Sequence, residues 1–153
     1  MKTLFKNQTL SKNIKWFFNT CIFVTLCVFT VNAQDEVIVE VHDAKKVGEN
    51  EYQLTTAANN KMGAIWSTNY IDLNHDFRIE ADLNFGTKDA SGADGMALVF
   101  QPNCTGEGSD GGGLGYQGVT PSLGFEFDTW QNANYGDPTQ DHLGIQKNGD
   151  VNH

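Results

Sequence analysis

The chain has 153 residues, with 19 acidic and 10 basic side chains and a formal net charge of −9. This length suits a single domain, and the acidic balance excludes a nucleic-acid-binding surface, which requires clustered basic residues. Hydrophobic residues make up 39% of the chain and glycine occupies 16 positions, a composition too apolar for a disordered protein. We therefore expect a folded, glycine-rich protein built mainly from strands.

The first 33 residues have the three-part pattern of a secretory signal peptide. Four lysines are followed by an apolar run that reaches Val31, and Val31 and Ala33 stand at the −3 and −1 positions of a cleavage site before Gln34. The apolar run is short for a membrane span, which needs about 20 residues. The sequence thus predicts a signal peptide at 1–33, export to the cell surface or medium, and no membrane insertion of the mature chain. An uncleaved anchor is the alternative.

Cleavage would leave an acidic chain with a single cysteine. It removes four of the ten basic residues, none of the 19 acidic residues and two of the three cysteines. Cys104 then has no partner for an intrachain disulfide, so rigidity must come from the core or from bound ions. A surplus of carboxylates suits Ca²⁺, which prefers oxygen ligands.

Short apolar stretches separated by glycine and asparagine clusters predict strands. Some stretches alternate apolar and polar residues, which indicates half-buried strands, and 96–100 is continuously apolar, which indicates burial on both faces. No helical period is seen after the first 33 residues. Many short strands favour an all-β sandwich or jelly roll. The predicted strands are 37–41, 77–85, 96–100, 123–128 and 142–145.

The densest group of metal-ligating residues lies between the last two predicted strands. Glu126 and Asp128 share one face of a strand, which leaves Phe125 and Phe127 to point into the core. His142 opens the next strand, so these side chains converge with Asp137 if the two strands are neighbours. An acidic, solvated loop beside a histidine whose hydrogen bonds are satisfied is the alternative.

The residue types in this group select the ion. Three carboxylates and one imidazole suit a Mn²⁺-like ion, whereas Asp128, Asn132, Asp137 and a loop carbonyl make an all-oxygen set for Ca²⁺. Zinc is disfavoured, because neither Cys104 nor His142 has a local partner in the sequence.

Three motifs follow one another along the chain: an Ala-Asp-Gly turn at 93–95, a glycine-rich loop at 111–116, and a metal loop at 126–132 that is followed by Asp137-Pro138 and 142–145. In type and order they strongly resemble motifs of L-type (legume-type) lectins, in which the glycine-rich loop contacts the sugar. The similarity extends from about residue 64 to 149 and is greatest to the secreted bacterial branch of the family.

The resemblance implies a concanavalin-A-like jelly-roll sandwich of antiparallel sheets with one Mn²⁺ and one Ca²⁺. By analogy, the transition metal would be held by Glu126, Asp128, Asp137 and His142. Calcium would be held by Asp128, the Trp130 carbonyl, Asn132 and Asp137.

The resemblance also implies a shallow sugar site beside the ions. Asp94 would accept hydrogen bonds from sugar hydroxyls, while Asn132 and a backbone N–H of Gly112 or Gly113 would donate them. Trp130 would stack on the sugar ring. The Ala93–Asp94 peptide bond is cis in the family.

The function implied is non-catalytic carbohydrate binding. The first alternative is a glycoside hydrolase of the laminarinase type, which needs a second carboxylate on the strand. Trp130 stands at that position, so no enzymatic activity is expected. The second alternative is an adhesin module or remnant whose sugar site has decayed, against which Asp94 and Asn132 argue.

The chain is short for such a sandwich, because all-β domains of this kind routinely need about 200–250 residues. We therefore expect 34–153 to be the N-terminal part of a lectin-like domain, truncated at its C-terminus, with further domains in an intact protein. An incomplete sandwich is expected to fold poorly or to need a partner segment.

Overall fold

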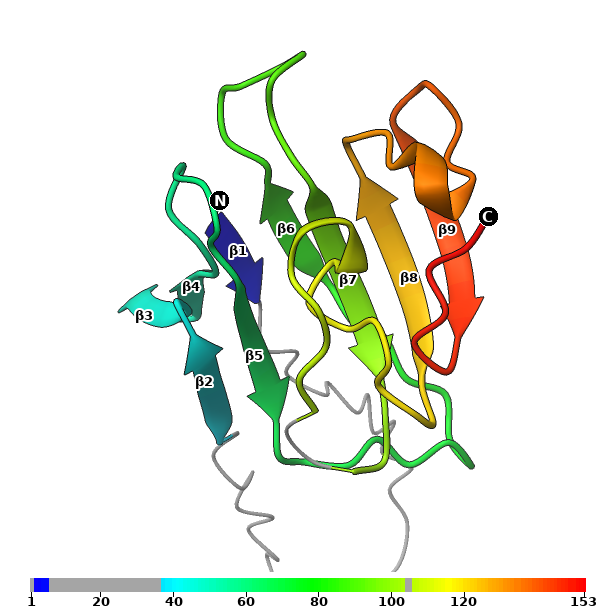
Figure 1. The fold of residues 1–153 in the computed structure, drawn as a ribbon. Coiled ribbons are helices and arrows are strands. Elements are labelled where there is room, and N and C mark those ends of the chain that lie inside the picture. The colour runs from blue at the N-terminus through cyan, green and yellow to red at the C-terminus, as the bar shows by residue number, and fades with distance from the viewer. Residues whose placement is uncertain (1, 6–36, 104–105) are drawn as a thin grey trace, which may run out of the picture.

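The computed structural model describes residues 2–5, 37–103 and 106–153 (Figure 1). These residues form nine strands and two short 3-10 turns, and none of them lies in a helix long and apolar enough to cross a membrane. The all-β prediction is confirmed. The elements are β1 (Lys2–Phe5), β2 (Ile38–His42), β3 (Lys45–Gly48), β4 (Glu51–Gln53), β5 (Gly63–Ser67), β6 (Ala81–Asn84), β7 (Gly95–Phe100), η1 (Gly111–Gly113), β8 (Leu123–Asp128), η2 (Ala133–Tyr135) and β9 (His142–Lys147).

The strands form three antiparallel sheets with the orders β3-β4-β1-β6, β2-β5 and β7-β8-β9. β1 comes from the predicted signal peptide and pairs with β4 and β6. The rest of that segment, with its apolar run and cleavage site, lies outside the described residues, as does Cys104.

The strand predictions differ in how well they hold. Strand 123–128 is confirmed as β8, while β9 extends past 145 and β2 is displaced by one residue from 37–41. Only the second half of the predicted strand 77–85 forms, as β6, and Phe77 and Ile79 are exposed. The length of β6 is set by its pairing with β1, whose four residues face only Ala81–Asn84 on that side. The alternating pattern therefore overestimated the length of this strand.

The continuous apolar run of β7 is less buried than predicted. Among the described strands β7 pairs with β8 alone, and only Met96 within it is fully buried. One reason is a broad groove that β5, β6 and β7 line. The prediction of burial on both faces is wrong for the described structure.

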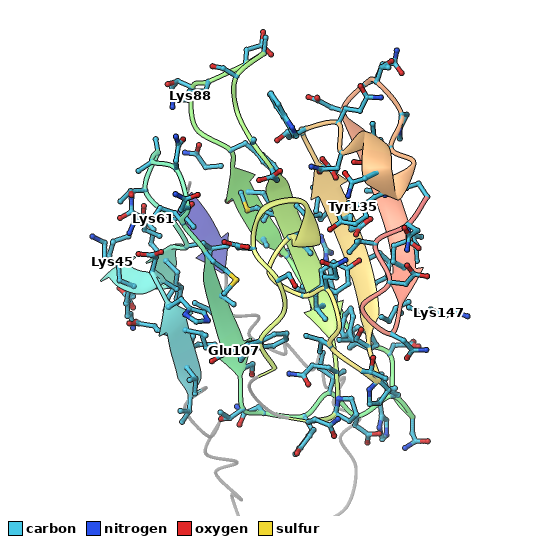
Figure 2. The ribbon with its side chains drawn as sticks, in the orientation of Figure 1. Lys45, Lys61, Lys88, Glu107, Tyr135 and Lys147 are labelled. Carbon is cyan, nitrogen blue, oxygen red and sulfur yellow. The ribbon has the colours of Figure 1, made fainter. Side chains whose placement is uncertain are left out.

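A small core lies on one face of the β7-β8-β9 sheet. Tyr116, Val119 and Val151 are buried there, with Leu114 and Tyr135 packed against them. In Figure 1 the yellow glycine-rich loop and the red C-terminal segment cross this face of the sheet. Figure 2 shows Tyr135 directed inward beside β8, whereas Lys147 extends away from β9. The loop and the C-terminal segment therefore act as the covering layer.

The covered face of β8 carries its carboxylates. Burial alternates along the strand, with Glu126 and Asp128 buried and Phe125 and Phe127 only partly buried. On the phenylalanine side of the sheet, the neighbouring strand β9 exposes 60% of Leu143. The predicted alternation is thus correct, but the described core lies on the carboxylate side, because the glycine-rich loop packs there.

Gly124 is expected to be essential for this packing. A Cβ at Gly124 would lie 2.7 Å from Tyr116 Cε2, far closer than van der Waals contact allows. Gly124→Ala should therefore lower the free energy of unfolding by about 1–3 kcal/mol, as overpacking does, in urea denaturation of the full chain. Gly48→Ala is the control, because its Cβ would meet only the flexible Glu51 side chain. Equal effects of the two variants would contradict the packing described.

Candidate functional site

β8 and β9 bring the predicted metal ligands together. The two strands are antiparallel neighbours, and their register sets Asp128 opposite His142 and Glu126 opposite Gly144. Glu126, Asp128 and Asp137 are all buried, with Glu126 only 1% exposed. The structure therefore gathers the predicted carboxylates on the covered face of the sheet.

Backbone N–H groups fold the loop after β8 around two of these carboxylates. Trp130 N–H donates to Asp128 Oδ1 at 2.8 Å, and Asn132 N–H donates to Asp137 Oδ2 at 2.6 Å. Gly136, with a φ of 84°, ends η2 in a left-handed conformation directly before Asp137. A side chain at that φ would be strained, so glycine suits the turn.

A buried tyrosine fixes the orientation of Glu126. Tyr116 O–H donates to Glu126 Oε1 at 2.5 Å. Burial raises the pKa of Tyr116, and the Glu126 carboxylate raises it further, so the phenol stays a donor. Glu126 Oε2 accepts no directed hydrogen bond from the described residues. One carboxylate oxygen is thus held, and the other remains available as a ligand.

The electrostatics of the loop favour a cation. Burial raises the pKa of Asp128, and the nearby carboxylates of Asp137 and Glu126 raise it further, while the Trp130 N–H opposes them. Like charges buried together disfavour ionisation unless a positive charge compensates them. A divalent cation would supply that charge.

His153 also lies in this cluster, and the sequence reasoning missed it. Its Nε2 is 3.1 Å from Glu126 Oε2, 3.3 Å from His142 Nε2 and 3.9 Å from Asp137 Oδ1. The backbone N–H of His153 donates to the carbonyl oxygen of Tyr135 at 2.9 Å, and this hydrogen bond attaches the C-terminal segment to η2. β9 and a turn separate it from the metal loop, so no local spacing signalled its position.

The donor atoms fit two cations. Glu126 Oε2 lies without a directed hydrogen bond among carboxylates and imidazoles, as a transition-metal ligand would. Asn132 Oδ1 is likewise buried without a partner among the described residues, and Asp128 and Asp137 flank its loop. A buried polar atom without a partner calls for an explanation, and an ion is one.

The Ala-Asp-Gly turn lies against the end of β8. The Ala93–Asp94 bond is cis, as the resemblance predicts. Asp94 O accepts hydrogen bonds from Thr129 N–H at 2.9 Å and from Thr129 Oγ1 at 3.1 Å. Burial raises the pKa of Asp94, an Asn132 side-chain hydrogen bond lowers it, and Asp110 raises it. Asp94 and Asn132 therefore meet at one place.

The glycine-rich loop reaches the same place through Gly112. A Cβ on Gly112 would lie 2.6 Å from Asn132 Cγ, so only glycine allows this approach. Gly113 is less suited to a ligand, because its N–H donates to Asp110 O at 3.0 Å. Trp130 is 43% exposed at the edge of the site, which leaves its ring accessible.

Residues 28–153 match the legume lectin β-barrel domain. The chain belongs to this family. The match includes the turn, the glycine-rich loop and the metal loop, which are the three segments that the fold brings together. Carbohydrate binding and bound metal ions are general properties of this family of lectins.

Two curated proteins are similar to about half of this lectin-family chain. The pesticidal crystal protein Cry22Aa of Bacillus thuringiensis is 46% identical over 81 residues, which are 52% of this chain and 11% of that protein. The serine-rich adhesin for platelets of Staphylococcus aureus (strain MRSA252) is 34% identical over 84 residues, which are 52% of this chain and 6% of that protein. The chain thus spans about a tenth or less of the length of these relatives.

Tyr116→Phe tests the support of Glu126. The variant removes the hydrogen bond to Oε1, so the affinity for a transition-metal ion should fall about 10–100-fold, as loss of a ligand's supporting partner does. Isothermal titration of the chelator-treated chain measures this. Tyr70→Phe is the matched control, because Tyr70 is exposed. Unchanged affinity in Tyr116→Phe would show that the hydrogen bond does not support a ligand.

Proposed function

We propose that this domain binds carbohydrate without catalysis, at a shallow site that Ca²⁺ and a transition-metal ion organise. The observation that carries the proposal is the meeting of Asp94, Gly112 and Asn132 directly beside buried carboxylates. Asn132 belongs to both groups, since its N–H bonds to Asp137 while its side chain bonds to Asp94.

Two sets of ligands would hold the ions. Glu126, Asp128, Asp137 and His142 would hold the transition metal, and Asp128, Asn132, Asp137 and the Trp130 carbonyl would hold calcium. Bound, the ions would compensate the buried negative charge and fix the loop. The loop is then ordered before a sugar arrives, so less conformational entropy is lost on binding.

The side chains at the site suit the chemistry of a sugar. Each sugar hydroxyl both donates and accepts hydrogen bonds, and the Asp94 carboxylate accepts while the Asn132 amide and the Gly112 N–H donate. The accessible ring of Trp130 offers an apolar face to the C–H side of the sugar. These groups suit the recognition of a polyhydroxylated ring.

The surroundings of Glu126 also favour binding over hydrolysis. Retaining hydrolysis requires two carboxyl groups about 5–5.5 Å apart that reach the substrate. Glu126 is buried and hydrogen-bonded to Tyr116, and Trp130 stands at the alternate sequence position where a laminarinase-type enzyme would carry its second carboxylate. A laminarinase-type mechanism therefore has no support at this site.

Export and adhesion complete the proposal. The signal-peptide pattern of residues 1–33 supports secretion or display at the cell surface. The similarity to the serine-rich adhesin for platelets supports, as the second candidate, a role as an adhesion module within a larger protein. In either setting the partner would be a glycan or polysaccharide.

Glycan-array binding of the full chain tests the sugar site. Binding should be lost in Asp94→Ala and Asn132→Ala and should fall with EDTA, because each change removes a sugar contact or the ion that orders it. Asp89→Ala and Asn134→Ala are the matched controls, since both residues are exposed and lie on the same loops. Release of reducing ends from a β-glucan would contradict the proposal and favour the enzyme.

Trp130→Ala tests stacking on the sugar ring. Aromatic contacts are worth about 0.5–1.5 kcal/mol beyond burial, so the affinity for the glycan identified on the array should fall up to roughly tenfold. Trp130→Phe should retain most of it, and the melting temperature should change little, because Trp130 is exposed. Equal losses of affinity in both variants would argue against stacking.

A further inference from the structure

A second imidazole lies among the carboxylates of β8 and of the loop that follows it. The side chain of His153 is only 17% exposed, and its Nε2 lies 3.1 Å from Glu126 Oε2 and 3.3 Å from His142 Nε2. Ligand atoms of Asp137, His142 and His153 all lie within 4.8 Å of one another. The two imidazoles come from opposite ends of the segment that begins at β9, so only the fold brings them together.

Hydrogen bonds alone do not account for this arrangement. A neutral imidazole nitrogen has either one N–H or one lone pair, and it points in one direction. His153 Nε2 nevertheless faces a second imidazole nitrogen and a carboxylate oxygen, and Glu126 Oε2 receives no directed hydrogen bond from the described residues. A cation held by ligand atoms of Asp137, His142 and His153, beside Glu126 Oε2, would satisfy this arrangement.

Two of the three separations from His153 Nε2 match those of adjacent ligands on one ion, and the third, 3.9 Å to Asp137 Oδ1, is longer. Nitrogen and oxygen ligands that lie about 2.0–2.2 Å from a metal, at tetrahedral or octahedral angles, are about 3.0–3.5 Å apart. The distances from His153 Nε2 to His142 Nε2 and to Glu126 Oε2, 3.3 and 3.1 Å, both fall in this range.

The backbone leaves room for this ligand set and holds it in place. A Cβ on Gly144 would lie 2.5 Å from Glu126 Oε2 and 2.8 Å from His153 Cε1. Any side chain at this position would therefore collide with the side chains of Glu126 and His153. The hydrogen bond from His153 N–H to Tyr135 O fixes the end of the segment that carries the imidazole.

We infer that His153 is a fifth protein ligand of the transition-metal site, which shifts its preference from Mn²⁺ toward Co²⁺, Ni²⁺ or Zn²⁺. The inference rests on the metal site of the proposed function. Carboxylates suit Mn²⁺, whereas imidazole suits the later divalent ions, whose intrinsic affinities are also higher. His153 thus supplies the second nitrogen ligand that the spacing of residues around His142 in the sequence did not reveal.

Titration of the chelator-treated full chain with Co²⁺, followed by its visible absorption bands, tests this ligand. His153→Gln should weaken Co²⁺ binding about 10–100-fold or more and alter the bands, while Ca²⁺ affinity stays within about twofold. His142→Gln should behave like His153→Gln. His75→Gln is the matched control, because that histidine is exposed beside Asp72. Co²⁺ binding by His153→Gln equal to that of the unaltered chain would overturn the inference.

Histidine ¹⁵N spectra of the unaltered chain provide a readout that does not depend on a variant folding. Of the four histidines, addition of Zn²⁺ should shift the Nε2 resonances of His142 and His153 together and at one equivalent. A shift of His142 alone would overturn the inference while leaving the metal site of the proposed function intact. The absence of any bound Zn²⁺, Co²⁺ or Mn²⁺ would overturn both.

Discussion

The structure depends on the burial of three carboxylates, Glu126, Asp128 and Asp137, on one face of a small sheet. Burying an ionised carboxylate costs several kcal/mol unless hydrogen bonds and an opposite charge compensate it. Two backbone N–H groups and the Tyr116 hydroxyl compensate part of this cost, and they also shape the loop after β8. A divalent cation is the natural source of the remaining positive charge.

Asn132 couples this charged cluster to the surface. Its N–H bonds to Asp137, its side chain bonds to Asp94, and its Cγ lies where a side chain on Gly112 would stand. Any ion that orders the loop therefore also orders the groups proposed to contact a sugar. The lectin family uses metal ions in general, and this linkage would give a bound ion a physical role here.

The covering layer is as important as the strands. The glycine-rich loop supplies Tyr116 to Glu126, and the C-terminal segment supplies Val151 to the core and His153 to the carboxylates. A layer that consists of connecting loops thus provides both packing and side chains that contact the carboxylates. This explains why the carboxylate side of β8 is more buried than its phenylalanine side.

The sequence by itself determined the all-β class, strand 123–128 and the grouping of Glu126, Asp128, Asp137 and His142, because alternation and local spacing are written in neighbouring residues. Only the tertiary structure decided which face of β8 is covered, where the strand predicted at 77–85 begins, and that Gly112 rather than Gly113 adjoins Asn132. Likewise, only the tertiary structure placed His153 beside Glu126. These features depend on strand partners and on a loop folded across the sheet, and contacts between residues distant in sequence leave no periodic pattern.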